Sequence, residues 1–300
     1  MSAVLGVDIG GTRLRAALVG AGGAVRLRLE APTPAREGPE AVVALIGELA
    51  GRLAEGGEKP VAAGVCAPGP IDTERGVALG VPTLAGWDGV PIADMIAKEL
   101  GLPTVVENDA IAAANGEWIF GAGRGFRHMV YVTVSTGIGG GAVVDGRLLH
   151  GRAGLAAHVG HMIVSPGGAL CSCGNRGCWE AYASGTAFAA RLREAGYADA
   201  AAAYARADAG DERAKTLIAE QGDWLGVGVT SLMHLFSPEL VVLGGGVSAA
   251  FGRFEAAISR RVAESAMPAF RDVKVVPAAL GDNCGLVGAA ALVMAKLRPA

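Results

Sequence analysis

Three of the five cysteines of this chain lie within eight positions, in the segment CSCGNRGC at residues 171–178. A histidine precedes them and completes the pattern H-x9-C-x-C-x4-C, with glycines between that let the short segments turn. Thiolates and imidazole are ligands of tetrahedral zinc, whereas a disulfide framework is expected in oxidising compartments. Four protein ligands leave no open position for chemistry, so the pattern predicts a structural Zn²⁺ site formed by His161, Cys171, Cys173 and Cys178.

Two glycine-rich loops have the composition of phosphate-binding loops. The first, in GVDIGGTRLRAALV, offers the Asp8 carboxylate at a strand end, two glycines and the Thr12 hydroxyl. The second, in YVTVSTGIGGGAVV, offers Ser135, Thr136 and the backbone N–H groups that follow them. Either loop alone is typical of a hairpin turn, but the repetition favours binding of a nucleotide polyphosphate. A dinucleotide-binding fingerprint and a G-x-x-x-x-G-K-[ST] P-loop are both excluded.

A third segment with polar side chains at a strand end is VVENDAIAAANGE, at residues 105–117. One interpretation is local: Asn108 or Asp109 accepts backbone N–H bonds and caps the helix that follows. The other is chemical: Asp109 lies at the carboxyl end of a strand, where α/β proteins bind ligands, and acts as general base for a hydroxyl nucleophile. The residues alone leave both interpretations open.

The elements that must position these residues form two α/β halves, each of which begins with a strand, a glycine loop and a second strand. In the first half we expect strands at 4–9, 13–19, 24–30, 61–65 and 104–107, and helices at 39–55, 91–100 and 109–119. The second half begins at Met129, with a turn at Asp145–Gly146, strands at 240–243 and 273–276, and helices at 179–193, 211–235, 249–265 and 286–297. This alternation predicts an α/β fold.

The composition narrows the classes of partner. The chain has 300 residues and a formal net charge of −3, so it lacks the basic surface that nucleic acid binding requires. The N-terminal segment has no basic region of a signal peptide, and the apolar stretch at 284–295 is shorter than the roughly 18 residues of a membrane span. We therefore expect a soluble cytoplasmic protein with neither nucleic acid nor membrane as a partner.

The segments DIGGT, ENDA, STGIGGG, the GH before CSCGNRGCWEAYASG, and VVLGGG together resemble the ROK family (repressors, open reading frames, kinases), in the family's order and over almost the whole chain. The resemblance implies an α/β fold of the actin-like ATPase (ribonuclease H-like) type, with two α/β domains around a cleft. The domains would be 1–117, joined by the C-terminal helix 286–300, and 118–285, which contains the zinc-binding loop. It also implies ATP-dependent phosphorylation of a hexose or N-acetylhexosamine at the 6-hydroxyl, with ATP, Mg²⁺ and structural Zn²⁺ as cofactors, and a homodimer.

Carried over by position, the resemblance makes Asp109 the base that takes the proton from the 6-hydroxyl of the sugar. The sugar site would comprise Gly69, Thr83, Asn108, Asp109, His158, His161 and Glu180. Asp8 would help to place Mg²⁺, and the phosphates would lie against Gly10, Gly11, Thr12, Thr136 and Gly137. The adenosine would be flanked by Gly244, Gly245 and Gly246. His161 would bind Zn²⁺ through one ring nitrogen and face the sugar with the other.

Three departures from the family pattern bear on the substrate. The usual E-x-G-H reads HVGH, so His158 replaces a glutamate that contacts sugar; it either contacts the sugar or turns away and packs. Ile111 replaces a second asparagine, and Pro82-Thr83 replaces the Pro-Asn of glucokinase-like members. His158 and Thr83 favour N-acetylmannosamine, with glucose as the alternative. A non-catalytic sugar-sensing protein is the third reading, but only seven residues precede Asp8, so we expect no helix-turn-helix.

Overall fold

The computed structural model describes residues 3–81 and 83–297 and contains two compact units. The first unit comprises Met1–Gly125, Arg147–Ala157 and Ala279–Ala300, and the second comprises Phe126–Gly146 and His158–Ala278. The chain thus enters the second unit twice and returns to the first each time. The segment 147–157, which the sequence analysis assigned to the other domain, packs with the first unit.

The sheet of the first unit has the order β3-β2-β1-β4-β8. Its strands are β1 (Val4–Ile9), β2 (Arg13–Val19), β3 (Val25–Pro32), β4 (Ala63–Ala67) and β8 (Thr104–Asn108). Strands β1, β2 and β3 form an antiparallel meander, whereas β1, β4 and β8 are parallel. The register pairs Asp8 with Cys66 and Cys66 with Glu107, so the carboxyl ends of the parallel strands bring these side chains to one edge.

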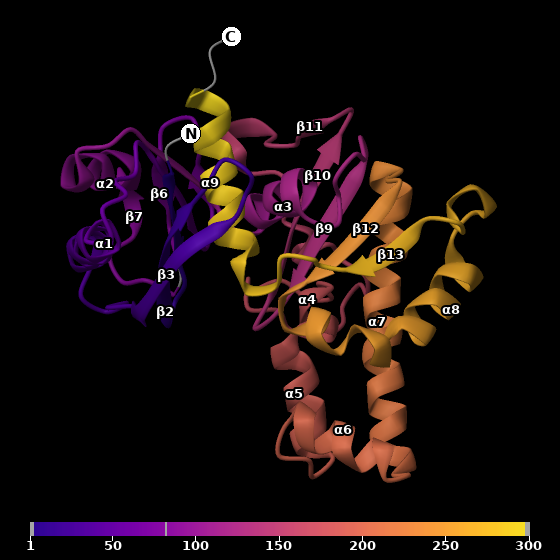
Figure 1. Ribbon diagram of the computed structural model, residues 1–300. Coiled ribbons are helices and arrows are strands. Elements are labelled where there is room, and N and C mark those ends of the chain that lie inside the picture. The colour runs from indigo at the N-terminus through magenta and orange to yellow at the C-terminus, as the bar shows by residue number, and fades with distance from the viewer. Residues whose placement is uncertain (1–2, 82, 298–300) are drawn as a thin grey trace. The chain divides into compact units, whose positions relative to one another are not determined.

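Four helices cover this sheet: α1 (Pro39–Ala54), α2 (Ile92–Leu100), α3 (Asp109–Phe120) and α9 (Cys284–Leu297). Helix α9 packs directly on the strands (Figure 1), because Gly64 of β4 leaves room for the carbonyl of Ala289 where a Cβ atom would collide. Gly288 lets α9 approach the Ala112 carbonyl of α3 in the same way. A small antiparallel sheet, which the sequence analysis missed, completes the unit: β5 (Ile71–Asp72), β6 (Val77–Leu79) and β7 (Asp88–Val90).

The second unit contains four strands in the order β10-β9-β12-β13. They are β9 (Met129–Val134), β10 (Ile138–Val144), β12 (Leu240–Gly244) and β13 (Lys274–Pro277). Strands β9 and β10 form the expected hairpin, and β9, β12 and β13 are parallel. After β10 the chain turns at Asp145 (φ 53°) and Gly146 (φ 69°), the two positive φ angles of a type I′ turn, into β11 (Arg147–Leu148).

The helices of the second unit differ from the expectation in three places. The helix expected at 179–193 is divided into α4 (Glu180–Ala183) and α5 (Gly185–Glu194) by Ser184, whose extended backbone and side chain cap α5. Helix α6 (Ala200–Asp208) was not expected, and it packs beside α7 (Glu212–Phe236) (Figure 1). Helix α8 (Glu255–Ser265) starts later than expected because Gly245–Arg253 forms a 3₁₀ segment.

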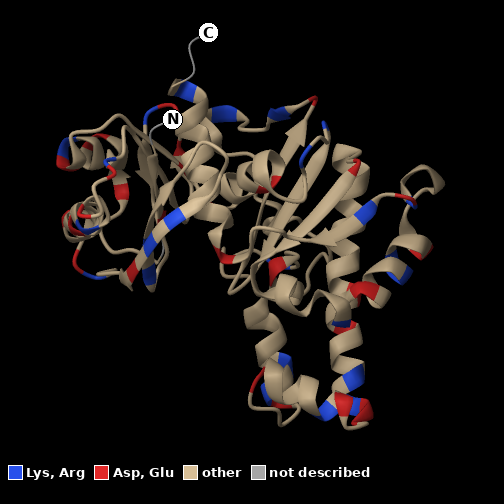
Figure 2. Ribbon diagram, viewed as in Figure 1, with Lys and Arg blue, Asp and Glu red and all other residues tan. Residues whose placement is uncertain are grey.

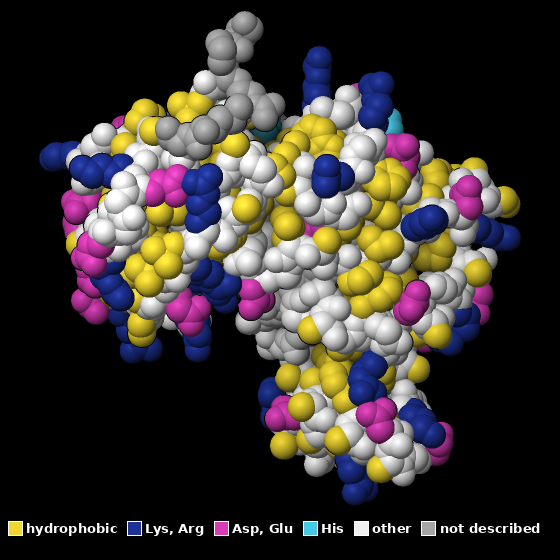
Figure 3. Space-filling view, viewed as in Figure 1, with side chains coloured by type: hydrophobic (Ala, Val, Ile, Leu, Met, Phe, Trp, Pro, Cys, Tyr) yellow, Lys and Arg dark blue, Asp and Glu magenta, His cyan; other side chains and the backbone are white. Residues whose placement is uncertain are grey.

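Strands β2 and β3 carry several charged side chains, as do the helices and loops, whereas the central strands β9 and β12 carry none (Figure 2). On the face that Figure 3 draws, side chains of both signs are interspersed with apolar ones. Within residues 3–81 and 83–297, no helix has the length and apolar character needed to cross a membrane.

Candidate active site and metal centre

Asp8 lies at the end of β1, on the edge where the parallel strands of the first unit finish. Its carboxylate accepts a hydrogen bond from Arg15 at 3.2 Å and lies 3.5 Å from the Cys66 thiol. Burial raises the pKa of the Asp8 carboxyl, and the Arg15 guanidinium opposes that shift. Arg15, which the sequence analysis did not single out, thus holds the carboxylate on which Mg²⁺ is predicted to bind.

Asn108 is the N-cap of α3. Its Oδ1 accepts the backbone N–H groups of Ala110 (3.0 Å) and Ile111 (3.2 Å), and its Nδ2 donates to the Gly69 carbonyl (3.0 Å). The side-chain amide has two N–H donors, and the Asn108 side chain also forms a hydrogen bond with the Asp109 carboxyl. Gly69 has φ +83°, a conformation that favours glycine, and it presents its carbonyl to the amide.

Asp109 follows as the first residue of α3, and its Oδ1 accepts the N–H of Ala110 at 2.8 Å. The capping interpretation is therefore correct for Asn108, and the Asp109 carboxylate accepts the same Ala110 N–H group. Burial, followed by the negative charge of Asp8, raises the pKa of Asp109 from 3.8 to about 6. A carboxyl with that pKa is ionised near neutral pH and still basic enough to accept a proton.

The loop between β1 and β2 is closed by a hydrogen bond from the Gly10 N–H to the Arg13 carbonyl at 2.9 Å. Thr83 lies over this loop, because a Cβ atom on Gly11 would be 3.1 Å from the Thr83 Cβ. Thr12 is exposed at the tip, and its carbonyl accepts the N–H of Thr33 at 3.0 Å. The structure therefore brings Thr83 to the glycine loop; Pro82 lies outside the described residues.

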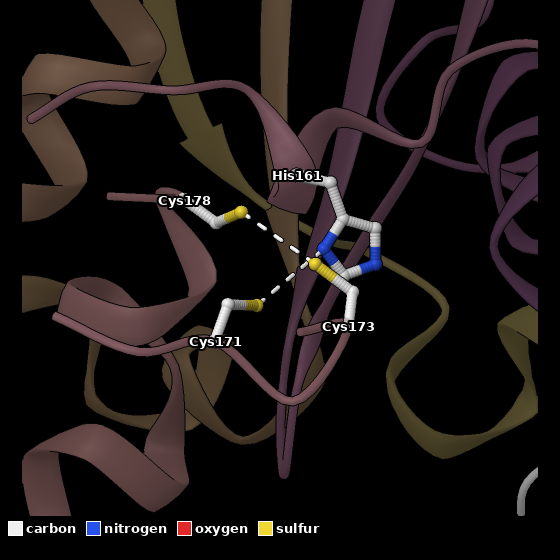
Figure 4. Close-up of side chains that lie close together, drawn as sticks. All are labelled: His161, Cys171, Cys173 and Cys178. Atoms are coloured by element: carbon white, nitrogen blue, oxygen red, sulfur yellow. Dashed lines mark hydrogen bonds between the residues drawn. The ribbon is translucent and has the colours of Figure 1, made fainter. Parts of the chain in front are cut away.

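The second unit assembles the predicted zinc ligands. The donor atoms of His161, Cys171, Cys173 and Cys178 all lie within 4.8 Å of one another. Figure 4 shows the three thiols and the Nδ1 face of the imidazole pointing toward a common centre, with Nε2 directed away from it. The Sγ atoms of Cys173 and Cys178 are 3.7 Å apart, and Cys171 Sγ is 3.7 Å from Nδ1.

This geometry fits tetrahedral zinc. A Zn–S bond of about 2.3 Å gives a tetrahedral S···S edge of about 3.8 Å, close to the separation of Cys173 and Cys178. The same separation is far longer than the roughly 2.04 Å of a disulfide, and the cysteines are free thiols. The structure therefore offers three soft sulfur ligands and one imidazole around a point, the donor set of a closed structural site.

Glu180 joins the cysteine segment to the second glycine loop. Its Oε2 accepts the N–H of Ile138 at 2.8 Å, and its Oε1 accepts the Ser172 hydroxyl at 2.8 Å and lies 3.8 Å from the Cys171 thiol. Gly137 leaves space for this carboxylate, since a Cβ atom there would be 2.5 Å from Oε2. Ser172, inside the CSC motif, is a contact that sequence reasoning missed.

Trp179, between the last cysteine and Glu180, anchors this segment to α7. Its side chain is fully buried, its Nε1 donates to the Trp224 carbonyl at 2.6 Å, and its ring occupies space that Gly228 leaves open. The metal centre and the glutamate are thus fixed to the longest helix of the unit rather than to loops alone.

The remaining predicted residues of the second unit lie on its loops. His158 is exposed, and desolvation, followed by the charge of His161, lowers its pKa. The Thr136 carbonyl accepts the Thr186 hydroxyl at 2.7 Å. Gly245 has φ +72°, and a Cβ atom there would be 2.5 Å from the Val134 carbonyl. The segment 244–246 therefore lies beside the strand that leads into the second glycine loop.

The sequence matches the ROK family over residues 4–296. It is 37% identical over 312 residues to a glucokinase of Thermotoga maritima, with 98% of each chain covered. It is 38% identical over 290 residues to an N-acetylmannosamine kinase of Shigella flexneri, covering 96% of this chain and 97% of that one. Its structure is similar to that of a ROK family glucokinase from Streptomyces griseus in complex with glucose and AMPPNP, with a TM-score of 0.85, 34% identity, and 97% and 99% of the chains covered.

Proposed function

Since this chain belongs to the ROK family, we propose that it transfers the γ-phosphoryl group of ATP to the 6-hydroxyl of a hexose or N-acetylhexosamine, with N-acetylmannosamine as the preferred acceptor. The chain is an ATP-dependent sugar kinase, and its fold is the actin-like ATPase (ribonuclease H-like) fold expected from the sequence. The finer assignments of base, ligands and acceptor are the proposal.

The observation that carries the mechanism is the state of Asp109. Its carboxylate lies at the start of α3, and a pKa of about 6 suits proton acceptance near neutral pH. In the proposed step, the sugar O6 forms a bond to the γ-phosphorus while the bond from that phosphorus to the β,γ-bridging oxygen breaks. The hydroxyl proton passes to Asp109, and ADP leaves with the bonding electron pair. Kinases of this kind act by positioning and charge neutralisation.

The other groups of the first unit orient the acceptor and the donor. The side-chain amide of Asn108 would hydrogen-bond a ring hydroxyl, and Gly69 and Thr83 would line the sugar site. Gly10, Gly11 and Thr12 would hydrogen-bond the phosphates. The Asp8 carboxylate is the hard oxygen ligand that Mg²⁺ prefers, and it lies at the strand edge beside this loop. Bound Mg²⁺ supplies charge neutralisation for the phosphates.

In the second unit, Thr136 and Gly137 would contact the phosphates, and Gly244 to Gly246 would flank the adenosine. Glu180 would accept hydrogen bonds from sugar hydroxyls through lone pairs not used by Ile138 and Ser172. His161 would face the sugar with Nε2. Zn²⁺, bound by His161 and the three cysteines, supplies rigidity to the segment that carries these groups.

The choice of acceptor rests on His158 and Thr83. A glutamate at position 158 would accept hydrogen bonds only, whereas the exposed imidazole either donates or accepts. Sequence identity does not separate the two acceptors, since it is 37% to a glucokinase and 38% to an N-acetylmannosamine kinase. The test compares kcat/KM for N-acetylmannosamine and glucose in wild type and His158→Glu. We expect the variant to shift the ratio toward glucose; a wild type that strongly prefers glucose would overturn the choice.

A second experiment tests the reaction itself. We expect phosphorylation with ATP in a panel of glucose, mannose, fructose, N-acetylglucosamine and N-acetylmannosamine. Asp109→Asn should lower kcat by about 10²–10⁴-fold while sugar binding by calorimetry is retained. Sugar binding without turnover in the wild type would instead indicate the sugar-sensing alternative. The homodimer and the cytoplasmic location stay predictions, the first to be measured by light scattering.

A further inference from the structure

A buried carboxylate two residues before the proposed base takes part in none of the steps above. Glu107, in the edge strand β8, is 2% exposed. Its Oε1 accepts the backbone N–H of Asn108 at 2.8 Å, and its Oε2 lies 3.0 Å from Nε2 of His150. The two residues are 43 positions apart in the chain, so only the packing of segment 147–157 on the first unit brings them together.

The charge state of this pair follows from its hydrogen bonds. A carboxylate this deeply buried is costly unless it has a charged or hydrogen-bonding partner. Nε2 of His150 lies within hydrogen-bond distance of the carboxylate. The imidazolium form brings to it the positive charge that a buried carboxylate needs. The bond to Glu107 raises the pKa of His150, whereas desolvation and the positive charge of Lys296 on α9 oppose the shift.

The carboxylate also governs the turn from β8 into α3. Asn108 is held through its backbone N–H by Glu107 and through its side chain by Gly69 and the start of α3. The next residue is Asp109, and the position of its carboxylate depends on the direction in which this turn leaves the strand. A displacement of about 1 Å at such a position is enough to cost on the order of 10²-fold in rate.

We propose that His150 and Glu107 are a positioning pair for the sugar kinase reaction, in which the protonated imidazole neutralises the buried carboxylate and the carboxylate fixes the Asn108–Asp109 turn. The inference rests on the proposed role of Asp109 as base. Neither residue touches the reacting atoms; each acts through the backbone of Asn108.

The pair makes catalysis sensitive to alkaline pH. Because the pKa of His150 is raised in the folded protein, the cation is present below the ordinary value near 6.5 and is lost as the pH rises through the raised value. Loss of the proton removes the charge that faces Glu107. We therefore expect kcat to decline on the alkaline side of its optimum.

The experiment measures kcat and KM from pH 6 to 10 in wild type, His150→Gln and His150→Arg. Glutamine is uncharged at every pH, so we expect kcat lowered by about tenfold at pH 7, without the His150-dependent decline. Arginine is always charged and pairs well with carboxylates. We therefore expect His150→Arg to have a kcat within about threefold of wild type and no alkaline decline in kcat. His128→Gln is the matched control, since His128 lies 3.7 Å from Asp145 in the second unit.

An independent readout is the NMR titration of the His150 imidazole. Glu107→Gln should lower its pKa toward about 6.5, since the amide keeps a hydrogen-bond acceptor but loses the charge. Wild-type kcat and an unchanged pH profile in His150→Gln would overturn the positioning pair and leave the base assignment intact. Wild-type kcat in Asp109→Asn would overturn the base assignment, and with it the catalytic role of the pair.

Discussion

We expect Asp109→Asn to raise the free energy of unfolding at neutral pH, where the same substitution abolishes most of the activity. Burial and the neighbouring Asp8 charge raise the pKa of Asp109 from 3.8 to about 6 in the folded state. The folded protein therefore favours the neutral carboxyl, and ionisation at neutral pH destabilises it. Asparagine has the same shape and keeps an oxygen for the Ala110 N–H, but it carries no charge.

The size of the effect follows from linkage. A shift of about two pKa units corresponds to about 3 kcal/mol, the upper limit of the gain in unfolding free energy for the Asp109→Asn variant at pH 8. The sign is that of a raised carboxyl: the difference between variant and wild type is near zero below pH 3.8. It grows between pH 3.8 and about 6 and is constant above. At pH 4 it should be about 0.5 kcal/mol.

Urea unfolding of both proteins at pH 4, 6 and 8 measures this difference, with calorimetry to separate the transitions of the two units. Asp272→Asn is the matched control, because it makes the same chemical change at an exposed position and should show no growth with pH. In parallel, kcat/KM of the wild type should fall to half near pH 6 on the acid side, where the base becomes protonated. A variant whose stability differs from wild type by the same amount at all three pH values would refute the reasoning.

Two further predictions concern the second unit. Cys173→Ser should lower the zinc content from one ion per chain, reduce the unfolding free energy and raise sugar KM. Metal analysis, urea unfolding and steady-state kinetics measure these three effects. The control Cys284→Ser should keep the zinc. Zinc-free wild type with full activity would contradict this. Gly137→Ala should raise sugar KM by about tenfold, because the added Cβ would lie 2.5 Å from Glu180 Oε2. The control Gly51→Ala, in open space on α1, should leave the kinetics unchanged. Equal sugar KM values for Gly137→Ala and wild type would exclude a role of this contact.

The local parts of the site were predictable because short sequence segments determine them. The spacing of the cysteines and His161 predicted a cluster that the structure forms within 4.8 Å, since glycine turns close such short loops with few alternatives. The hairpins around the glycine loops followed from strand periodicity and turn residues. The sequence also left two interpretations of the ENDA segment, capping by Asn108 or Asp109 and general-base catalysis by Asp109, without deciding between them.

What the sequence by itself determined is therefore the family to which the chain belongs and its α/β fold; a carboxylate base and a zinc-braced loop are predictions from the same motifs. Only the tertiary structure decided which atoms of those residues remain available. Asn108 caps α3, and Glu180 hydrogen-bonds both the cysteine segment and the second glycine loop. His150 contacts Glu107, which lies 43 positions away in the chain. These outcomes depend on desolvation and on contacts between distant segments, which arise only when the sheets and helices pack and which no local pattern encodes.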